Sequence, residues 1–204
     1  MAAVQARSIA TRTALLDAAL TTLVEDGYAA TTTTEVAARA GVSRGAQLHH
    51  FPTKAELLTA AVEHLLERRV ADFERALAAV DADADRLEAA VDLVWSQFQT
   101  PVFVAWVELW IAARTDPALA AAVIEMDVRF TEETRARFVA AFPPAEDDDP
   151  MLYDIGRDFA FAVMEGVALQ RLVPRGQRPA RDYLDALKRM FRLLRSPRSG
   201  SCAR

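Results

Sequence analysis

Apolar residues recur at helical spacing along almost the whole chain. In the first segment Leu16, Leu20 and Leu23 form one stripe of a helix that we place at about 8–26. No stretch of the sequence alternates between apolar and polar residues over the length of a strand. The pattern therefore predicts an all-α protein of about nine helices with no sheet.

Two short helices follow, and each has its own start signal. Thr32 and Glu35 form a capping box for a helix at about 33–40, which a glycine then ends. Ser43 is a good N-cap for a further helix at about 44–50. Two short helices after a longer one match a helix-turn-helix unit.

The remaining helices are longer. The fourth begins with a second capping box, in which Thr53 is the N-cap, and reaches about Ala78. Five more apolar segments are separated by proline-containing or acidic loops. They cover residues 84–99, 101–114, 117–141, 151–173 and 180–195.

The charge distribution leaves room for a basic surface near the N-terminus. The net charge of −5 argues mildly against a nucleic-acid partner when it is taken alone. Residues 1–71 nevertheless hold seven basic and seven acidic groups, whereas residues 72–170 hold seven basic and twenty acidic groups. A single face of the first segment can therefore be basic.

Composition also restricts the compartment and the chemistry. The one cysteine, Cys202, cannot form a disulfide within the chain, and the N-terminus has no apolar segment typical of a secretory signal. The most apolar run, 102–111, is too short to span a bilayer. We therefore expect a cytoplasmic protein that has no membrane partner, and the sequence indicates neither a metal site nor a cofactor.

The third helix carries side chains suited to the major groove of DNA. Arg44 offers a guanidinium that matches guanine or phosphate, while Gly45 and Ala46 permit close approach, and Ala46 could touch a thymine methyl. Gln47 either reads a base or faces solvent. Lys54 opens the fourth helix, where the helix dipole mildly disfavours a cation, so a phosphate contact would explain its position.

The two adjacent histidines do not resemble a metal site. On a helix the side chains of His49 and His50 point about 100° apart, so they do not converge on one ion. For His49 the functional alternative to a metal or catalytic role is a contact with phosphate. For His50 packing at the base of the helix or capping of a carbonyl is favoured.

The run "TTTTEVAARAGVSRGAQLHHFPTKAELL", with "LLDAALTTLVEDGYAATT" before it, closely resembles the DNA-binding domain of TetR-type transcriptional regulators over about residues 9–60. The resemblance implies a homodimeric, all-helical regulator that binds a palindromic double-stranded DNA operator and a small-molecule effector. It also implies a helix-turn-helix DNA-binding domain followed by a larger helical ligand-binding and dimerisation domain. We expect a DNA-binding domain at 1–52, a connecting helix at 53–80, an effector-binding and dimerisation domain at 81–195 and a flexible tail at 196–204.

The expected DNA-binding residues lie in the two short helices and at the start of the fourth. They are Thr32, Thr33, Ser43, Arg44, Gly45, Ala46, Gln47, His49, Thr53 and Lys54. One position departs from the family pattern, because many members have a tyrosine where this chain has Leu48. Leu48 cannot supply the phenolic hydroxyl that those members use on phosphate, so either His49 or Thr53 compensates or Leu48 only packs.

A heptad-like apolar series marks residues 151–173. Its steps alternate between three and four residues, the spacing of a helix that packs along another helix, and a second apolar stripe on another face can serve the core. We expect this helix and the last one to form an intermolecular four-helix bundle, and an ordinary monomeric core is the alternative. The expected interface residues are Leu152, Ile155, Phe159, Ala162, Gly166, Leu169, Leu184, Leu187, Phe191 and Leu194.

Residues 94–114 are unusually aromatic and contain all three tryptophans. Such residues serve either as core or as the lining of an apolar cavity, which would take an apolar or aromatic effector. If Glu108 is buried, it needs a partner, either Arg114 or Arg157 or a polar or cationic group of the effector. The candidate effector-binding residues are Trp95, Phe98, Phe103, Trp106, Glu108, Trp110, Met126, Phe130, Phe159 and Met164.

These patterns favour a ligand-responsive DNA-binding transcriptional regulator. The resemblance to the TetR-type family implies a repressor that a small apolar or aromatic effector releases from its operator. A ligand-independent DNA-binding activator or architectural protein is the alternative. An all-helical enzyme is a remote alternative, because the sequence contains no nucleophile–base pair, no metal-ligand set and no phosphate loop. We therefore do not expect an enzyme.

Overall fold

The computed structural model describes residues 2–81, 85–144, 146, 149–173 and 176–195, and within these ranges all side chains except those of residues 2–4, 69, 194 and 195. These residues form nine α-helices and contain no strand, which confirms the all-α prediction. The expected tail at 196–204, with Cys202, lies outside the described residues. Within the described part of the chain, no helix combines the length and the apolar character that crossing a membrane would require.

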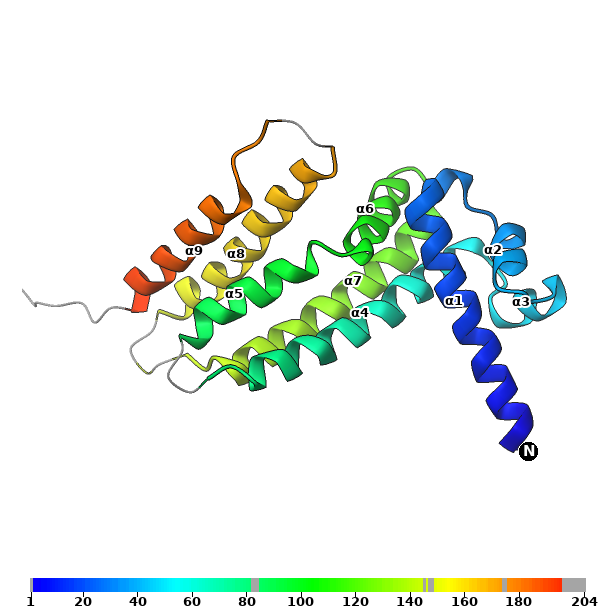
Figure 1. Cartoon of the computed structure of the whole chain (residues 1–204), viewed down its shortest axis with the longest axis horizontal. Coiled ribbons are helices and arrows are strands. Elements are labelled where there is room, and N and C mark those ends of the chain that lie inside the picture. The colour runs from blue at the N-terminus through cyan, green and yellow to red at the C-terminus, as the bar shows by residue number, and fades with distance from the viewer. Residues whose placement is uncertain (1, 82–84, 145, 147–148, 174–175, 196–204) are drawn as a thin grey trace, which may run out of the picture. The chain divides into compact units, whose positions relative to one another are not determined.

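Figure 1 shows the helices in chain order. Their bounds are α1 Ala2–Ala30, α2 Thr33–Arg39, α3 Arg44–His50, α4 Lys54–Ala78, α5 Arg86–Gln97, α6 Pro101–Ala113, α7 Pro117–Ala141, α8 Pro150–Arg171 and α9 Ala180–Arg195. The predicted bounds of α2 to α9 differ from these by no more than two residues. Only α1 is clearly longer than expected, at both ends.

Gly27 interrupts α1 rather than ending it. Its φ of 74° and ψ of 170° are not helical, yet the helix resumes and reaches Ala30. This backbone conformation is almost restricted to glycine, because a Cβ would clash with the flanking peptide groups. The interruption frees the backbone N–H of Tyr28 for a partner outside α1.

The three predicted N-caps are confirmed. The side-chain oxygens of Thr32, Ser43 and Thr53 accept hydrogen bonds from the third residue beyond each, over 3.1, 3.2 and 3.1 Å. Because these bonds satisfy backbone N–H groups that have no partner within their helix, they fix where α2, α3 and α4 begin.

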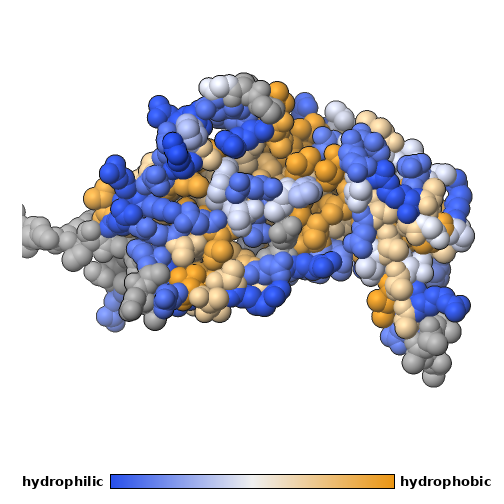
Figure 2. All heavy atoms as spheres, viewed as in Figure 1, coloured by the Kyte–Doolittle hydropathy of each residue, from blue (hydrophilic) through white to orange (hydrophobic). Residues whose placement is uncertain are grey.

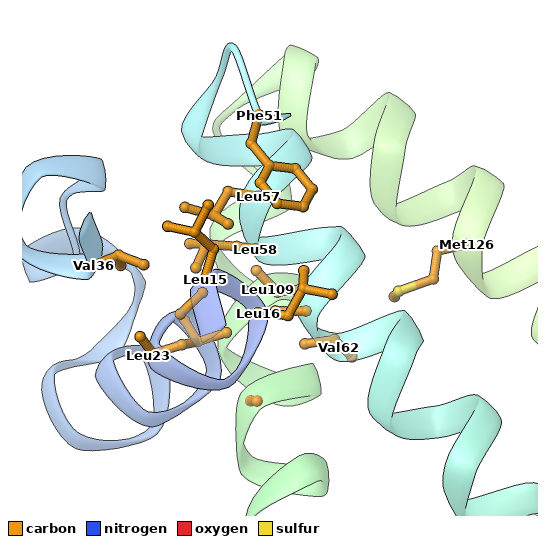
Figure 3. Close-up of a cluster of buried hydrophobic side chains, with 14 of the residues drawn as sticks. Leu15, Leu16, Leu23, Val36, Phe51, Leu57, Leu58, Val62, Leu109 and Met126 are labelled. Carbon is orange, nitrogen blue, oxygen red and sulfur yellow. The ribbon is translucent and has the colours of Figure 1, made fainter. Parts of the chain in front are cut away.

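The chain forms two compact units. The first contains residues 1–72 and 100–140, and the second contains residues 73–99 and 141–204. In the first unit α1 packs against α2, α3 and α6. Figure 3 shows its core of buried aliphatic and aromatic side chains, among them Leu15, Leu16, Leu23, Val36, Phe51, Leu57, Leu58, Val62, Leu109 and Met126.

The core of the second unit lies where α9 packs against α5 and α8. Trp95 of α5, Met164 of α8, and Leu184 and Leu187 of α9 are buried in this unit. An ion pair between Lys188 and Asp92 (2.6 Å) and a second between Arg192 and Glu88 join the exposed edges of α9 and α5.

Candidate nucleic-acid interface

The helix α3 presents one face to solvent. Arg44, Gly45, Leu48 and His49 are exposed, whereas Gln47 is buried. Residues four apart lie on the same side of a helix, so the pairs 44/48 and 45/49 form one continuous outward face. We call these four residues the outward face of α3.

Gln47 does not belong to this face, and its expected base contact is wrong for this structure. The side chain is only 1% exposed, and its Nε2 donates a hydrogen bond of 2.7 Å to the carbonyl oxygen of Phe51. The amide thus satisfies a backbone group just after α3 instead of facing DNA. The signal was present in the sequence, because Gln47 lies four residues before the apolar Phe51 and so shares its inward side.

Arg44 is oriented by the preceding helix. Its Nη1 donates a hydrogen bond of 3.1 Å to the Oγ1 of Thr34 on α2. The remaining guanidinium donors stay available at an exposed position. Thr34 was not among the expected residues, because its contact crosses the turn between the two helices and depends on the angle at which they pack.

The other expected DNA-binding residues lie around this face. Thr32, Ser43, Thr53 and His49 are exposed, and Thr33 and Ala46 are partly buried. The rings of His49 and His50 meet edge to face with centroids 5.5 Å apart, and the partly buried His50 ring lies 6.4 Å from that of Phe51. Among the described residues no group of three or more His, Cys, Asp or Glu side chains is placed to hold a metal ion.

Lys54 has a partner within the protein. Its Nζ lies 2.5 Å from the carbonyl oxygen of Tyr28, to which it donates, and 4.1 Å from the centre of the Tyr28 ring. Burial lowers the pKa of Lys54, and the nearby negative charge of Asp116 opposes this shift. The contact with Tyr28 therefore accounts for a cation at the first turn of α4, without any need for DNA.

Tyr28 joins the end of α1 to three other helices. Its backbone N–H donates to Glu108 Oε2 on α6 over 3.1 Å, and its hydroxyl donates to Asp116 Oδ2 over 3.1 Å. Asp116 also caps α7 by accepting from the N–H groups of Ala118 and Leu119. Together with Lys54 of α4, these contacts form what we call the Tyr28 junction.

Charge and burial at the Tyr28 junction shift two pKa values in opposite directions. Burial, with the hydrogen bond to Asp116 as a second cause, raises the pKa of Tyr28 to about 12. The N–H group of Leu119 is the largest cause that lowers the pKa of Asp116, and the Tyr28 hydroxyl adds to it. The neutral phenol and the ionised carboxylate are therefore the stable pair at neutral pH.

The partner expected for Glu108 is corrected by this geometry. Its Oε2 accepts a hydrogen bond from the backbone N–H of Tyr28, a partner that was not among those expected. Arg157 is instead held by its neighbour Asp158 on α8, over 2.5 Å. A Cβ added to Gly27 would lie 3.1 Å from Glu108 Oε2, so glycine also makes room for the carboxylate.

The effector candidates divide between the two units. In the first unit Phe103 and Met126 are buried, Trp110 is 56% exposed, and the Trp106 and Phe130 rings meet edge to face 6.5 Å apart. Hydrophobic surface is visible in Figure 2 in the region of α6. Two large apolar side chains of this helix, Trp110 and Ile111, are exposed.

A groove of about 330 Å³ lies between α4 and α7 in the same unit, and Met126 lines it. Glu56, Glu63, Glu125 and Arg129 also line this groove, so its walls are charged. It does not resemble the apolar cavity that the aromatic sequence predicts.

In the second unit the candidates form a smaller aromatic group. Trp95 and Met164 are buried, and the Phe98 ring lies 6.4 Å from both Trp95 and Phe161. Phe159, expected in both the effector site and the dimer interface, is 46% exposed on α8. It therefore does not line the interior of this unit.

The expected dimer residues fall into two groups. On α8, Leu152, Ile155, Phe159, Ala162 and Leu169 are exposed and Gly166 is partly so, while Met164 and Ala168 on the other stripe are buried. On α9, Leu184 and Leu187 are 7% and 3% exposed, so they are core residues and their assignment to the interface is wrong. Phe191 lies against Gly156 of α8, and the side chain of Leu194 lies outside those described.

A long helix followed by two short capped helices, the second of which is exposed on its outer side, is the arrangement of the helix-turn-helix class of DNA-binding proteins. The family model for bacterial regulatory proteins of the tetR family matches residues 15–61. The chain is 39% identical over 113 residues to the transcriptional regulator CymR of Pseudomonas putida. This alignment covers 55% of this chain and 56% of CymR. It is 31% identical over 137 residues to the transcriptional regulator BetI of Burkholderia thailandensis. That alignment covers 66% of this chain and 70% of BetI.

Solved structures share the fold over a larger part of the chain. The multidrug binding protein EbrR complexed with imidazole has a TM-score of 0.58 and 26% identity, over 88% of this chain and 93% of EbrR. EbrR is also known complexed with proflavin and with ethidium. A TetR family member from Streptomyces coelicolor has a TM-score of 0.62 and 24% identity, over 88% of this chain and 97% of that one.

This chain therefore belongs to the tetR family of bacterial regulatory proteins. Its match to the first curated relative, CymR, spans about half of that protein's length.

Proposed function

We propose that the protein is a transcriptional repressor that binds a palindromic operator as a homodimer and is released from it by a small apolar or aromatic effector. The outward face of α3 is the observation that carries the proposal. A helix of about 10–12 Å diameter fits a major groove about 12 Å wide. On this helix Arg44 and His49 are exposed, while Ser43 and Gln47 hold the two ends.

The proposed DNA contacts lie on α3 and on the helix ends around it. They are Thr32, Thr33, Ser43, Arg44, Gly45, Ala46, His49, Thr53 and Lys54. Lys54 has three donors and gives one to Tyr28, so the same ammonium retains donors for a phosphate. In this proposal residues 1–52 bind DNA, 53–80 connect, and 81–195 bind the effector and form the dimer.

The exposed stripe of α8 supports the homodimer. Four large apolar side chains of this stripe are each between 41% and 48% exposed, namely Leu152, Ile155, Phe159 and Leu169. Their steps of three, four and ten residues place them on one face of the helix. A two-fold symmetric dimer that packs through this stripe would bury the same residues of both subunits. It would also supply two copies of α3, one for each half-site.

The Tyr28 junction supports the proposed release mechanism. Glu108 and Asp116 belong to α6 and to the N-cap of α7, whereas Lys54 begins α4 directly after the helix-turn-helix. If an effector shifts α6 while these hydrogen bonds remain intact, Tyr28 would move with α6. The start of α4 would then move with Tyr28. Because linkage is reciprocal, DNA would weaken effector binding by the same factor.

Sequencing of the DNA that the purified protein retains from a random pool tests the proposed function. A repressor with a two-fold axis is expected to enrich one palindromic sequence. Enrichment of no sequence would contradict operator binding, and enrichment of a single half-site would contradict the dimer.

A second experiment tests release. Small aromatic compounds are titrated against the fluorescence of Trp95, Trp106 and Trp110, and each compound that binds is added to the complex with the selected DNA. Reduced DNA affinity at saturation is the expected result. If no bound compound changes the affinity, the ligand-independent regulator is favoured.

A further inference from the structure

Leu48 is the only exposed large apolar side chain between residues 15 and 61, the segment that matches the tetR family model. It is 44% exposed, and it lies on the outward face of α3, one turn after Arg44. A single exposed leucine is common on protein surfaces and needs no explanation by itself. Its position beside a guanidinium oriented by Thr34 does need one.

The chemistry of leucine restricts what Leu48 can contact on DNA. Its side chain neither donates nor accepts hydrogen bonds, so it can bind neither phosphate nor the polar edges of the bases. The major groove exposes one apolar group, the C5 methyl of thymine. A contact between the two removes apolar surface of both from water.

We propose that Leu48 reads a thymine methyl in each operator half-site, which rests on the proposed DNA-binding function. Four residues along a helix advance about 6 Å, and successive bases of one strand are about 3.4 Å apart. The thymine therefore lies within about two base pairs of the base that Arg44 contacts. Leu48 is then a specificity-determining residue at the position where many family members have a tyrosine.

Ala46 is the competing reader of a thymine methyl. It lies two positions before Leu48, so its side chain points to a different side of α3, and it is partly buried. The two residues would therefore contact different bases, and a scan of single thymines can separate them.

The test uses the DNA that the wild-type protein enriches from a random pool. Each thymine of one half-site is replaced in turn by deoxyuridine, which lacks only the C5 methyl, and the dissociation constant is measured for each duplex. Burial of one methyl changes affinity by roughly three- to fivefold, so one position is expected to show a loss of that size. In Leu48→Ala that loss disappears, whereas Leu48→Met retains it because its side chain is also apolar.

Ala46→Gly serves as the matched control. For each variant, the dissociation constant for deoxyuridine DNA is divided by that for thymine DNA, and only these ratios are compared. A change in the folded fraction of a variant affects both dissociation constants equally, so it cancels in the ratio. The proposal is overturned if the loss persists in Leu48→Ala, if it disappears in Ala46→Gly instead, or if no thymine shows a loss. Failure of the wild type to enrich any sequence would overturn the DNA-binding function as well, so the two failures are distinguishable.

Discussion

Replacement of Gly27 by alanine tests the role assigned to the interruption in α1. The backbone conformation at Gly27, with φ 74° and ψ 170°, costs a non-glycine residue roughly 1–3 kcal/mol. The added Cβ would also lie 3.1 Å from Glu108 Oε2, which accepts from Tyr28 N–H, and loss of that bond costs about 0.5–1.5 kcal/mol. Gly27→Ala is therefore expected to lower the free energy of unfolding by roughly 1.5–4.5 kcal/mol.

Two other glycines separate these contributions. Gly41 also has a positive φ, 63°, but a Cβ there would meet nothing within 4 Å, so Gly41→Ala should cost only about 1–2 kcal/mol for the left-handed backbone. Gly45 lies inside α3 with open space around it, and Gly45→Ala should stabilise the protein by about 0.5–1 kcal/mol.

Urea denaturation followed by circular dichroism measures all three variants. The expected order of stability is Gly45→Ala, wild type, Gly41→Ala and Gly27→Ala. In a Glu108→Ala background the cost of Gly27→Ala should fall by about 0.5–1.5 kcal/mol, because the hydrogen bond is already lost. If Gly27→Ala stays within about 0.5 kcal/mol of the wild type, the backbone argument is refuted.

Four further predictions concern DNA, charge and assembly. Arg44→Ala should weaken binding to the selected DNA by about 1–3 kcal/mol and relax the preference at one base, and equal losses on random DNA would contradict base reading. Lys54→Ala should weaken specific and random DNA alike and reduce the salt dependence, if the ammonium also contacts phosphate. An absorbance titration of tyrosinate should show one group that ionises near pH 12 and that is absent from Tyr28→Phe. Because the pKa of Tyr28 is raised in the folded state, its contribution to the free energy of unfolding is full below the unfolded pKa of about 10. That contribution falls as the pH rises towards 12. Phe159→Glu should shift light scattering from dimer to monomer, whereas a wild-type monomer would contradict the proposed bundle.

Local features of this protein were predictable from the sequence. The caps at Thr32, Ser43 and Thr53 depend on residues no more than three positions away, and each is confirmed. The same holds for the bounds of most helices, because apolar spacing and proline act within a few residues. The exposed stripe of α8 was also recognisable. On the second stripe Met164 and Ala168 are buried, whereas Leu172 is exposed.

Features that depend on distant residues were not predictable. Glu108 and Tyr28 are 80 positions apart, and nothing near Glu108 indicates that its partner is a backbone group freed by Gly27. Leu184 and Leu187 have a spacing suited to an interface or to a core, and only their packing in the second unit decides between the two. Periodicity identifies an apolar face but does not identify what covers it.

The helix α3 has only seven residues, fewer than an isolated helix needs to be stable in water. Its conformation depends on Ser43 at one end and on Gln47 and the buried Phe51 at the other. Leu48 is exposed and takes no part in that support, so substitutions there are expected to change the free energy of folding by no more than about 0.5 kcal/mol. Under the proposed function, operator preference can therefore diverge between related proteins, or be redesigned, without compensating changes in the core.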